Sequence, residues 1–325
     1  MRILLVYYSQ SGDAARIADT LVDSLQAPGI EIERECVRPM QPYPFPWRNV
    51  FRFFDVLPEC QLGPPPAIHE PKFASDRDYD LIVLVYQVWF LAPSLPIQGF
   101  LASPAARVLT GHKVMTVSVS RNMWQSASET MKSRLRQLGA VHMDNLVVTH
   151  QGPPWATFVT APRLLLFGKR NAFWKVFPPA GLGEAELQRV RRIGAAVRER
   201  LDRLRRTPPQ SLLCGLGAVE VNRRYLIPEL IGWYLFRGWA HALQRLGRIG
   251  RLPRYVGVGL FMLFLVTLVG MVMPIIVVVS ALFYPLGRMA TRAYAERLAE
   301  PSGSRKDKGE RRNEPWRSPD GNAPH

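Results

Sequence analysis

Three absences limit the functions open to this 325-residue chain. Only Cys36, Cys60 and Cys214 are present, far apart and without a Cys-x-x-Cys pair, which excludes a disulfide framework and a zinc site. Neither the Gly-x-x-x-x-Gly-Lys-Ser/Thr loop of nucleoside triphosphate sites nor the Gly-x-Gly-x-x-Gly loop of dinucleotide sites occurs. Free thiols without an N-terminal signal peptide indicate a reducing, cytosolic environment for the polar part of the chain.

Acidic residues are also scarce. The chain has 26 Asp and Glu against 42 Lys and Arg, a formal net charge of +16. A basic chain can bind nucleic acid, but no nucleic-acid motif is present and the arginines gather beside apolar segments. Anionic membrane lipid is therefore the expected partner, and nucleic acid is not.

The start of the chain has the pattern of an anion-binding loop. An apolar strand over 3–8 leads into a short Ser/Gly loop and then an amphipathic helix from Ala14. Free N–H groups and the helix dipole would both face a ligand at that point, and phosphate is the expected anion. A surface turn with a capped helix is the alternative. The candidate residues are Ser9, Gln10, Ser11, Gly12, Asp13 and Ala14.

Strand and helix patterns alternate through the first two-thirds of the chain. Apolar or alternating runs over 30–37, 80–86, 113–119 and 141–149 predict four further strands. A helical pattern after the apolar run 80–86 ends near Leu101, and two further helical patterns cover 125–138 and 184–206. This alternation predicts an α/β fold with a doubly wound, five-stranded parallel sheet.

The first loop resembles that of the flavodoxin family, which reads Thr/Ser-x-Thr/Ser-Gly-x-Thr and holds the phosphate of FMN. Ser9, Ser11 and Gly12 match this motif, whereas Ala14 replaces its last hydroxyl. The lost hydrogen bond is worth about 1 kcal/mol, which would weaken phosphate binding without abolishing it. The resemblance implies the strand order 2-1-3-4-5 and FMN as cofactor.

Two later loops extend the resemblance to the NAD(P)H-dependent FMN reductases. In these proteins a strand often ends in Pro-Val-Trp-Trp-Gly, followed by Pro-x-x-Pro. In this chain Gln87 replaces the first Pro and Leu91 replaces the Gly. In such a sheet the loop after the fourth strand meets the flavin ring. An alternative is that the aromatic residues only cover the sheet edge. The candidate residues of these loops are Gln87, Val88, Trp89 and Phe90, then Ser120, Arg121, Asn122, Met123 and Trp124.

Two segments of this chain are additional to the elements of a minimal flavodoxin. The stretches at about 38–75 and 152–183 are rich in aromatic residues and proline, and neither has the composition of a disordered segment. Long apolar insertions serve as lids or partner surfaces, or simply pack on the core. With these insertions, the flavodoxin-like domain is expected to span 1–206.

The C-terminal third predicts a membrane region. No charged residue occurs over 256–286, far beyond the ~20 residues that cross a bilayer. The segment 255–287 is expected to be a single tilted span, or a re-entrant hairpin bent near Gly270 to Pro274, because arginines flank both ends. Before it, 207–254 is expected to be an interfacial helical linker, and after it 288–325 a basic, mostly disordered tail.

Together these patterns predict a membrane-tethered oxidoreductase with its FMN domain in the cytoplasm, as at a bacterial inner membrane. Electrons would pass from NAD(P)H to a lipophilic acceptor, and the flavin rather than a side chain would carry the chemistry. No metal is expected, and a homodimer is one assembly that this pattern allows. The alternatives are an electron shuttle without its own substrate and a non-flavin scaffold. The layout is also similar to bacterial proteins labelled dialkylresorcinol condensing enzymes, which implies a role in aryl-lipid synthesis.

Overall fold

The computed structural model describes residues 1–74, 76–206, 210–272 and 292–302. Its centre is a parallel sheet of five strands in the order β2-β1-β3-β5-β6, which is the flavodoxin-like order predicted from the sequence. The two-residue strand β4 pairs antiparallel with the end of β3 and lies outside this path. The strands are β1 Arg2–Tyr7, β2 Glu31–Cys36, β3 Leu81–Trp89, β4 Ala92–Pro93, β5 Lys113–Ser120 and β6 Val141–Thr149.

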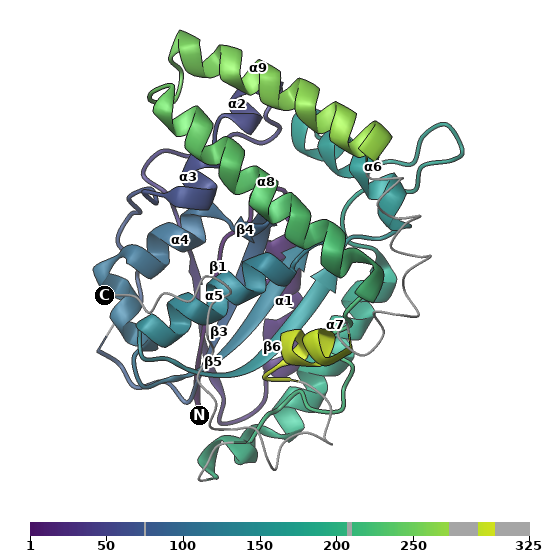
Figure 1. Cartoon of the computed structure of the whole chain (residues 1–325). Coiled ribbons are helices and arrows are strands. Elements are labelled where there is room, and N and C mark those ends of the chain that lie inside the picture. Colours follow the sequence, from purple (N-terminus) through teal and green to yellow (C-terminus); the bar gives the residue numbers. More distant parts are fainter. Residues whose placement is uncertain (75, 207–209, 273–291, 303–325) are drawn as a thin grey trace.

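Helices cover both faces of this sheet and the edge where its strands end (Figure 1). The α-helices of the sheet domain are α1 Asp13–Leu25, α4 Leu95–Ala102, α5 Gln125–Gln137 and α7 Glu184–Glu199. The insertions hold α2 Val50–Phe54, α3 Leu57–Leu62 and α6 Pro154–Phe167, and two long helices follow, α8 Leu226–Arg245 and α9 Leu252–Thr267. Short 3-10 segments are η1 Pro104–Leu109, η2 Leu201–Arg205 and η3 Arg223–Tyr225, and the π-helical η4 Leu268–Val272 prolongs α9.

Side chains along β1 alternate between two buried cores, which explains why the apolar run of this strand is continuous. Ile3 and Leu5 face one core with α1 and α7, whereas Leu4 and Val6 face a second core with α4 and α5. All four side chains are fully buried. Since each such side chain contributes about 1.5–3 kcal/mol through burial, a polar residue on either face of β1 would be costly.

One predicted strand and one predicted helix end at different residues in the structure. β3 continues to Trp89 instead of ending near residue 86, because Val88 and Trp89 pair with β4. The helix predicted over 184–206 ends at Glu199 and continues as η2. Leu201 and Leu204 are both buried there, and the tighter 3-10 turn places residues three apart on one side.

The first insertion carries the C-terminal helices. α3 packs along α8, and α2 contacts α9. Phe54 meets Phe261 with ring centroids 5.6 Å apart. Beneath this contact, the buried guanidinium of Arg254 on α9 pairs with Asp55 at 2.6 Å and with Glu59 at 2.5 Å. The segment 38–75 is therefore the platform on which α9 lies.

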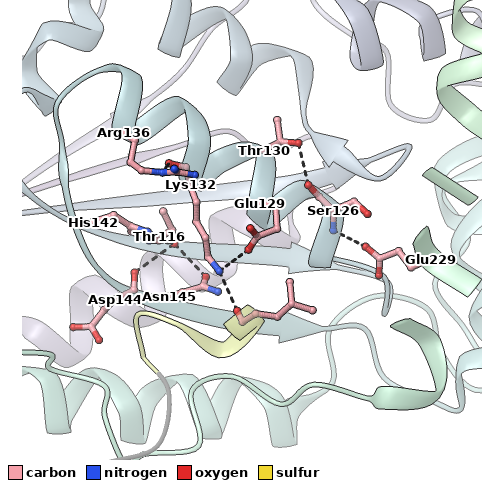
Figure 2. A network of polar contacts seen from close by, with 11 residues as sticks. Thr116, Ser126, Glu129, Thr130, Lys132, Arg136, His142, Asp144, Asn145 and Glu229 are labelled. Atoms are coloured by element: carbon pink, nitrogen blue, oxygen red, sulfur yellow. Dashed lines mark hydrogen bonds and ion pairs between the residues drawn. The ribbon is translucent and has the colours of Figure 1, made fainter. Parts of the chain in front are cut away.

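Within the tail expected over 288–325, the structure describes residues 292–302, and these residues are ordered. Residues 292–299 form a helix whose Leu298 side chain is fully buried. Lys132 on α5, labelled in Figure 2, donates to the carbonyl of Leu298 at 3.1 Å. Ser302 donates to Asp144 on β6 at 3.0 Å and accepts from the backbone N–H of Asn145 at 2.6 Å. Tertiary contacts thus return this part of the chain to the α/β domain, whereas residues 273–291 and 303–325 lie outside the described residues.

Candidate ligand site at the carboxyl ends of the strands

The loop after β1 has the backbone of an anion site but contains an anion of its own. Gly12 adopts φ +89°, a conformation that side chains rarely tolerate, and precedes the first residue of α1. That residue, Asp13, is fully buried and accepts a hydrogen bond from Ser11 at 3.0 Å. A carboxylate at a helix N-terminus is stabilised by the dipole, in the same way as a bound phosphate. Any ligand phosphate here has Asp13 as a neighbour.

Arg170 brings a positive charge to this loop from the second insertion. Its Nη1 donates to Asp13 Oδ1 at 2.7 Å, and its Nη2 donates to the carbonyl of Ser11. A side chain in place of Gly181 would collide with the guanidinium, so this glycine leaves room for Arg170. The sequence analysis missed Arg170. A signal was available, because residues 152–183 include four basic residues and no acidic one.

The loop after β3 braces the first loop. The buried Gln87 accepts from the backbone N–H of Gln10 at 3.2 Å, and its Nε2 lies 3.5 Å from Ser11 Oγ. Glutamine at the position where proline is commoner thus links the two loops through hydrogen bonds. Leu91, where glycine is commoner, has φ +64° and turns the chain into β4.

The aromatic residues of this second loop point into neighbouring clusters. Trp89 packs edge-on against Tyr8 and Tyr43, with centroid distances of 5.9 and 5.2 Å. Phe90 lies 5.2 Å from Phe53 and also contacts other rings of the first insertion and α8. Val88, the remaining predicted residue, is half-buried in the second core. The two aromatic candidates of this loop therefore hold the first insertion onto the sheet.

The loop after β5 lies beneath α6. The Arg121 guanidinium stacks on the ring of Phe158 at 3.9 Å, and burial lowers the pKa of Arg121 to about 10. Asn122 donates to Thr157 of α6 at 3.4 Å. Of the remaining predicted residues, Met123 is half-buried, whereas Trp124 is only 2% exposed and precedes α5 as part of the packed core.

Of the seven buried side-chain polar atoms that have no hydrogen-bond partner within the described part of the chain, two are hydroxyls of the predicted loops. They are Ser9 Oγ after β1 and Ser120 Oγ at the end of β5. Leaving a buried polar atom unpaired costs about 1–3 kcal/mol, so such atoms commonly satisfy a ligand or water. These serines come from two of the three predicted loops, which fits a polar ligand at the carboxyl edge.

The charges around the site favour an anionic ligand. His150 follows β6, and its Nε2 lies 3.8 Å from Asp13 Oδ2. Burial lowers the pKa of His150, the nearby Arg121 and Arg170 lower it further, and Asp13 opposes the shift. A neutral His150 leaves one carboxylate and two guanidinium groups, an excess of one positive charge. Among the described residues, no group of three His, Cys, Asp or Glu side chains is placed to hold a metal ion.

The strand order and the parallel pairing define this domain as an α/β fold of the flavodoxin-like type. Similar solved structures include a protein described as a flavoprotein from Bacteroides eggerthii, with 21% identity, a TM-score of 0.36 and coverage of 48% of this chain and 93% of that one. A flavoprotein in complex with FMN from Lactobacillus acidophilus has 19% identity, a TM-score of 0.34 and coverage of 46% and 90%. Flavodoxin 1 from Bacillus cereus has 14% identity, a TM-score of 0.34 and coverage of 60% and 95%.

No protein-family profile matches the chain, and no curated protein does. The fold assignment therefore depends on the strand order and parallel pairing of the structure itself.

Proposed function

We propose that the α/β domain binds FMN at the carboxyl edge of its sheet and takes part in electron transfer at a membrane. The observation that supports this most is the pair of buried, unpartnered hydroxyls of Ser9 and Ser120, on two loops beside an excess positive charge. The backbone of loop 9–12, with Ser9 and Ser11, would hold the phosphate, and Arg170 would offset its charge beside Asp13. Loop 120–122 would face the flavin ring. When bound, FMN supplies hydride or single-electron transfer.

The residues of this site would bind and shield the cofactor and would not react themselves. Gln87 keeps the first loop in position, and α6 keeps water from loop 120–122 through Thr157 and Phe158. We propose NAD(P)H as the electron donor and a lipophilic, quinone-like molecule or a long-chain biosynthetic intermediate as the acceptor. An acceptor in the lipid phase would account for an apolar helix attached to a redox domain.

The membrane attachment is supported by the exposed side of α9. The helix with its π-helical end, Leu252–Met271, is long and apolar enough to cross a bilayer, which by itself is weak evidence. One side faces outward with Leu252, Val256, Leu260, Leu263 and Val266, each at least 56% exposed. The opposite side, with Arg254, Val258 and Phe261, is buried against the domain. This asymmetry suits a helix that lies on its own domain and presents one apolar side to lipid.

Contacts at both ends of the apolar region favour the re-entrant arrangement over a single span. Arg254 is joined to Asp55 on one side of that region, and Ser302 is joined to Asp144 on the other. A single crossing would separate residues 292–302 from the α/β domain by a bilayer. We therefore propose that the apolar segment enters and leaves the membrane on the cytoplasmic side.

The Arg170–Asp13 pair favours a second candidate, a non-flavin scaffold. In that case the pair permanently occupies the N-terminus of α1, where a phosphate would bind. Titration of FMN into the full-length protein in mild detergent separates the two candidates. Saturable quenching of flavin fluorescence near one FMN per chain is expected for the redox protein, and no measurable affinity for the scaffold.

A matched pair of variants sharpens this titration. Gly12→Val places a branched side chain at φ +89° in the candidate phosphate loop, whereas Gly29→Val places one at φ +81° in an open turn between α1 and β2. Both variants carry similar backbone strain, but only Gly12→Val changes the candidate phosphate loop. Only Gly12→Val should therefore abolish FMN binding. Equal loss in both would contradict the site. Oxidation of NAD(P)H by the purified protein with a soluble quinone then distinguishes an enzyme from a shuttle.

A further inference from the structure

The second insertion exposes an apolar side that the proposed site does not use. On α6 the residues Trp155, Val159, Arg163 and Phe167 follow one another at intervals of four and therefore share one side of the helix. Trp155 is 55% exposed and Phe167 is 60% exposed, whereas Leu164 on the inner side is buried. This side therefore carries two large exposed aromatic rings, with the exposed Val159 and the half-buried Arg163 between them.

The segment after α6 continues this apolar side. The rings of Phe173 and Phe177 stack 4.6 Å apart, and their backbones exchange two hydrogen bonds of 3.1 Å. They close a tight loop in which Trp174 is 81% exposed and Val176 is 61% exposed. We define the 155–177 surface as the exposed side chains of Trp155, Val159, Phe167, Lys169, Trp174, Lys175 and Val176.

The charges of this segment indicate what the surface contacts. Residues 152–183 contain Arg163, Lys169, Arg170 and Lys175 but no Asp or Glu. Arg170 is engaged with Asp13, and Arg163 stacks on Phe173 at 4.3 Å, which leaves Lys169 and Lys175 exposed beside the apolar groups. Tryptophan next to lysine suits the headgroup region of an anionic bilayer, where each lysine adds about 1 kcal/mol to binding.

A shallow groove of about 520 Å³ lies between α6 and residues 169–173. Its lining is mostly apolar and includes Phe158, Val159, Pro162, Phe167 and Phe173, with Arg163 and Lys169 also at the groove. An apolar trough bordered by cations matches the chemistry of a phospholipid, whose chains are apolar and whose headgroup is charged.

The 155–177 surface and α9 belong to the same end of the molecule. The 38–75 segment contacts both, because the backbone N–H of Trp47 donates to the carbonyl of Leu165 on α6 at 2.9 Å and Phe54 packs on Phe261 of α9. Figure 1 shows α6 and α9 together at the end opposite the N-terminus. We propose that the 155–177 surface is a second membrane-contact element, which docks on anionic lipid independently of α9. This proposal rests on the membrane attachment proposed above.

Depth-dependent quenching tests the second contact. An environment-sensitive fluorophore is attached to the full-length chain at Trp174→Cys, in a background in which Cys36 and Cys214 are serine. The protein is reconstituted into vesicles of phosphatidylcholine with about one quarter phosphatidylglycerol, with or without spin-labelled lipid. Quenching is expected at position 174, as at Leu263→Cys on α9, and not at Gln137→Cys, which is exposed at the far end of α5.

Each result has a separate meaning. Quenching at 263 without quenching at 174 overturns the second contact and leaves the α9 attachment intact. Absence of quenching at both positions means that the proposed attachment itself fails, and FMN titration reports independently on the redox proposal. Disulfide cross-linking of Trp174→Cys chains in pairs would assign this surface to a second copy and would also overturn the proposal.

Charge reversal provides a second arm of the test. Lys169→Glu combined with Lys175→Glu should reduce quenching at position 174 by at least twofold in vesicles with phosphatidylglycerol, and leave position 263 unchanged. The matched control, Lys72→Glu with Lys113→Glu, carries the same change of charge outside the 155–177 surface and should reduce neither signal. Equal quenching at 174 in both double variants would contradict the electrostatic part of the proposal.

Discussion

The guanidinium of Arg170 donates to the buried carboxylate of Asp13 at 2.7 Å, across 157 positions of the chain. This ion pair joins the second insertion to the first residue of α1. Because Asp13 is fully buried, a phosphate placed at this helix terminus without Arg170 would lie beside an uncompensated negative charge. If the loop holds a phosphate as proposed, this pair supplies the positive charge that offsets Asp13.

Two substitutions at this pair should change FMN affinity in opposite directions. Arg170→Ala leaves Asp13 unpaired and should weaken binding at least tenfold, which corresponds to about 1.4 kcal/mol. Asp13→Asn removes the competing carboxylate and should strengthen binding, since Arg170 can then turn to the phosphate. Fluorescence titration in detergent measures both values.

Lys113→Ala is the control for this pair, because Lys113 lies at the amino end of β5, away from the candidate site. Its FMN affinity should equal that of the unmodified protein. If Arg170→Ala binds FMN as tightly as this control does, Arg170 has no role in holding the phosphate.

The buried ion pair under α9 should be important for stability. Arg254→Ala leaves Asp55, which is 1% exposed, without its positive partner, and should cost about 3–5 kcal/mol. Thermal unfolding in a fixed detergent measures the change. Arg251→Ala, at an exposed position just before α9, should have little effect. Equal unfolding temperatures for the two variants would show that α9 is held by its aromatic contacts alone.

Glu229 on α8 should make stability depend on pH. It accepts from the backbone N–H of Ser126 at 2.8 Å, beside loop 120–124, and burial raises its pKa from 4.5 to about 7 (Figure 2). The folded state thus retains a proton that the unfolded chain releases, so stability falls as pH rises from about 4.5 to 7. Glu229→Gln should remove this fall, which is on the order of 3 kcal/mol. Unfolding curves of both proteins across that pH range measure it, and parallel slopes would refute the assignment.

Ser302 should hold the returning C-terminal segment against the sheet. Ser302→Ala removes the contacts to Asp144 and to the backbone of Asn145, with a loss of about 1–3 kcal/mol. Hydrogen exchange over 292–302 should become faster, while exchange in β1 and β3 stays slow. Ser103→Ala, which removes a half-buried hydrogen bond to Phe100, serves as the control. Unchanged exchange over 292–302 would show that burial of Leu298 alone holds the segment.

Local patterns predicted most of the sheet. The end points of β6 agree with the prediction, and β5 is one residue longer, because buried parallel strands are continuous apolar runs bounded by turn residues. β3 was predicted too short, since its last residues are defined by pairing with β4 across the turn at Phe90 and Leu91. The first loop was also located correctly at the start of α1, because a glycine with positive φ at a helix start has a short-range signature.

The partners of the site residues could not be predicted in this way. Arg170 meets Asp13, and Phe158 covers Arg121, across long stretches of chain, and no local periodicity encodes such contacts. Trp124 illustrates the converse, since it was predicted as part of the loop that meets the flavin ring, whereas the structure buries its side chain in the core. The side chain directions in these loops depend on which neighbouring element fills the space.

The sequence by itself determined the positions of most strands, the Ser/Gly turn before α1 and the apolar C-terminal segment, because each depends on the residue types within a short window. The order of the strands was implied by the family resemblance and is given by their pairing in the structure. Only the tertiary structure decided that Asp13 is paired, that α9 lies on its own domain through Arg254, and that residues 292–302 return to β6. These features arise from the burial of charges and apolar surface between distant segments. Their energies depend on which groups meet after the chain has folded.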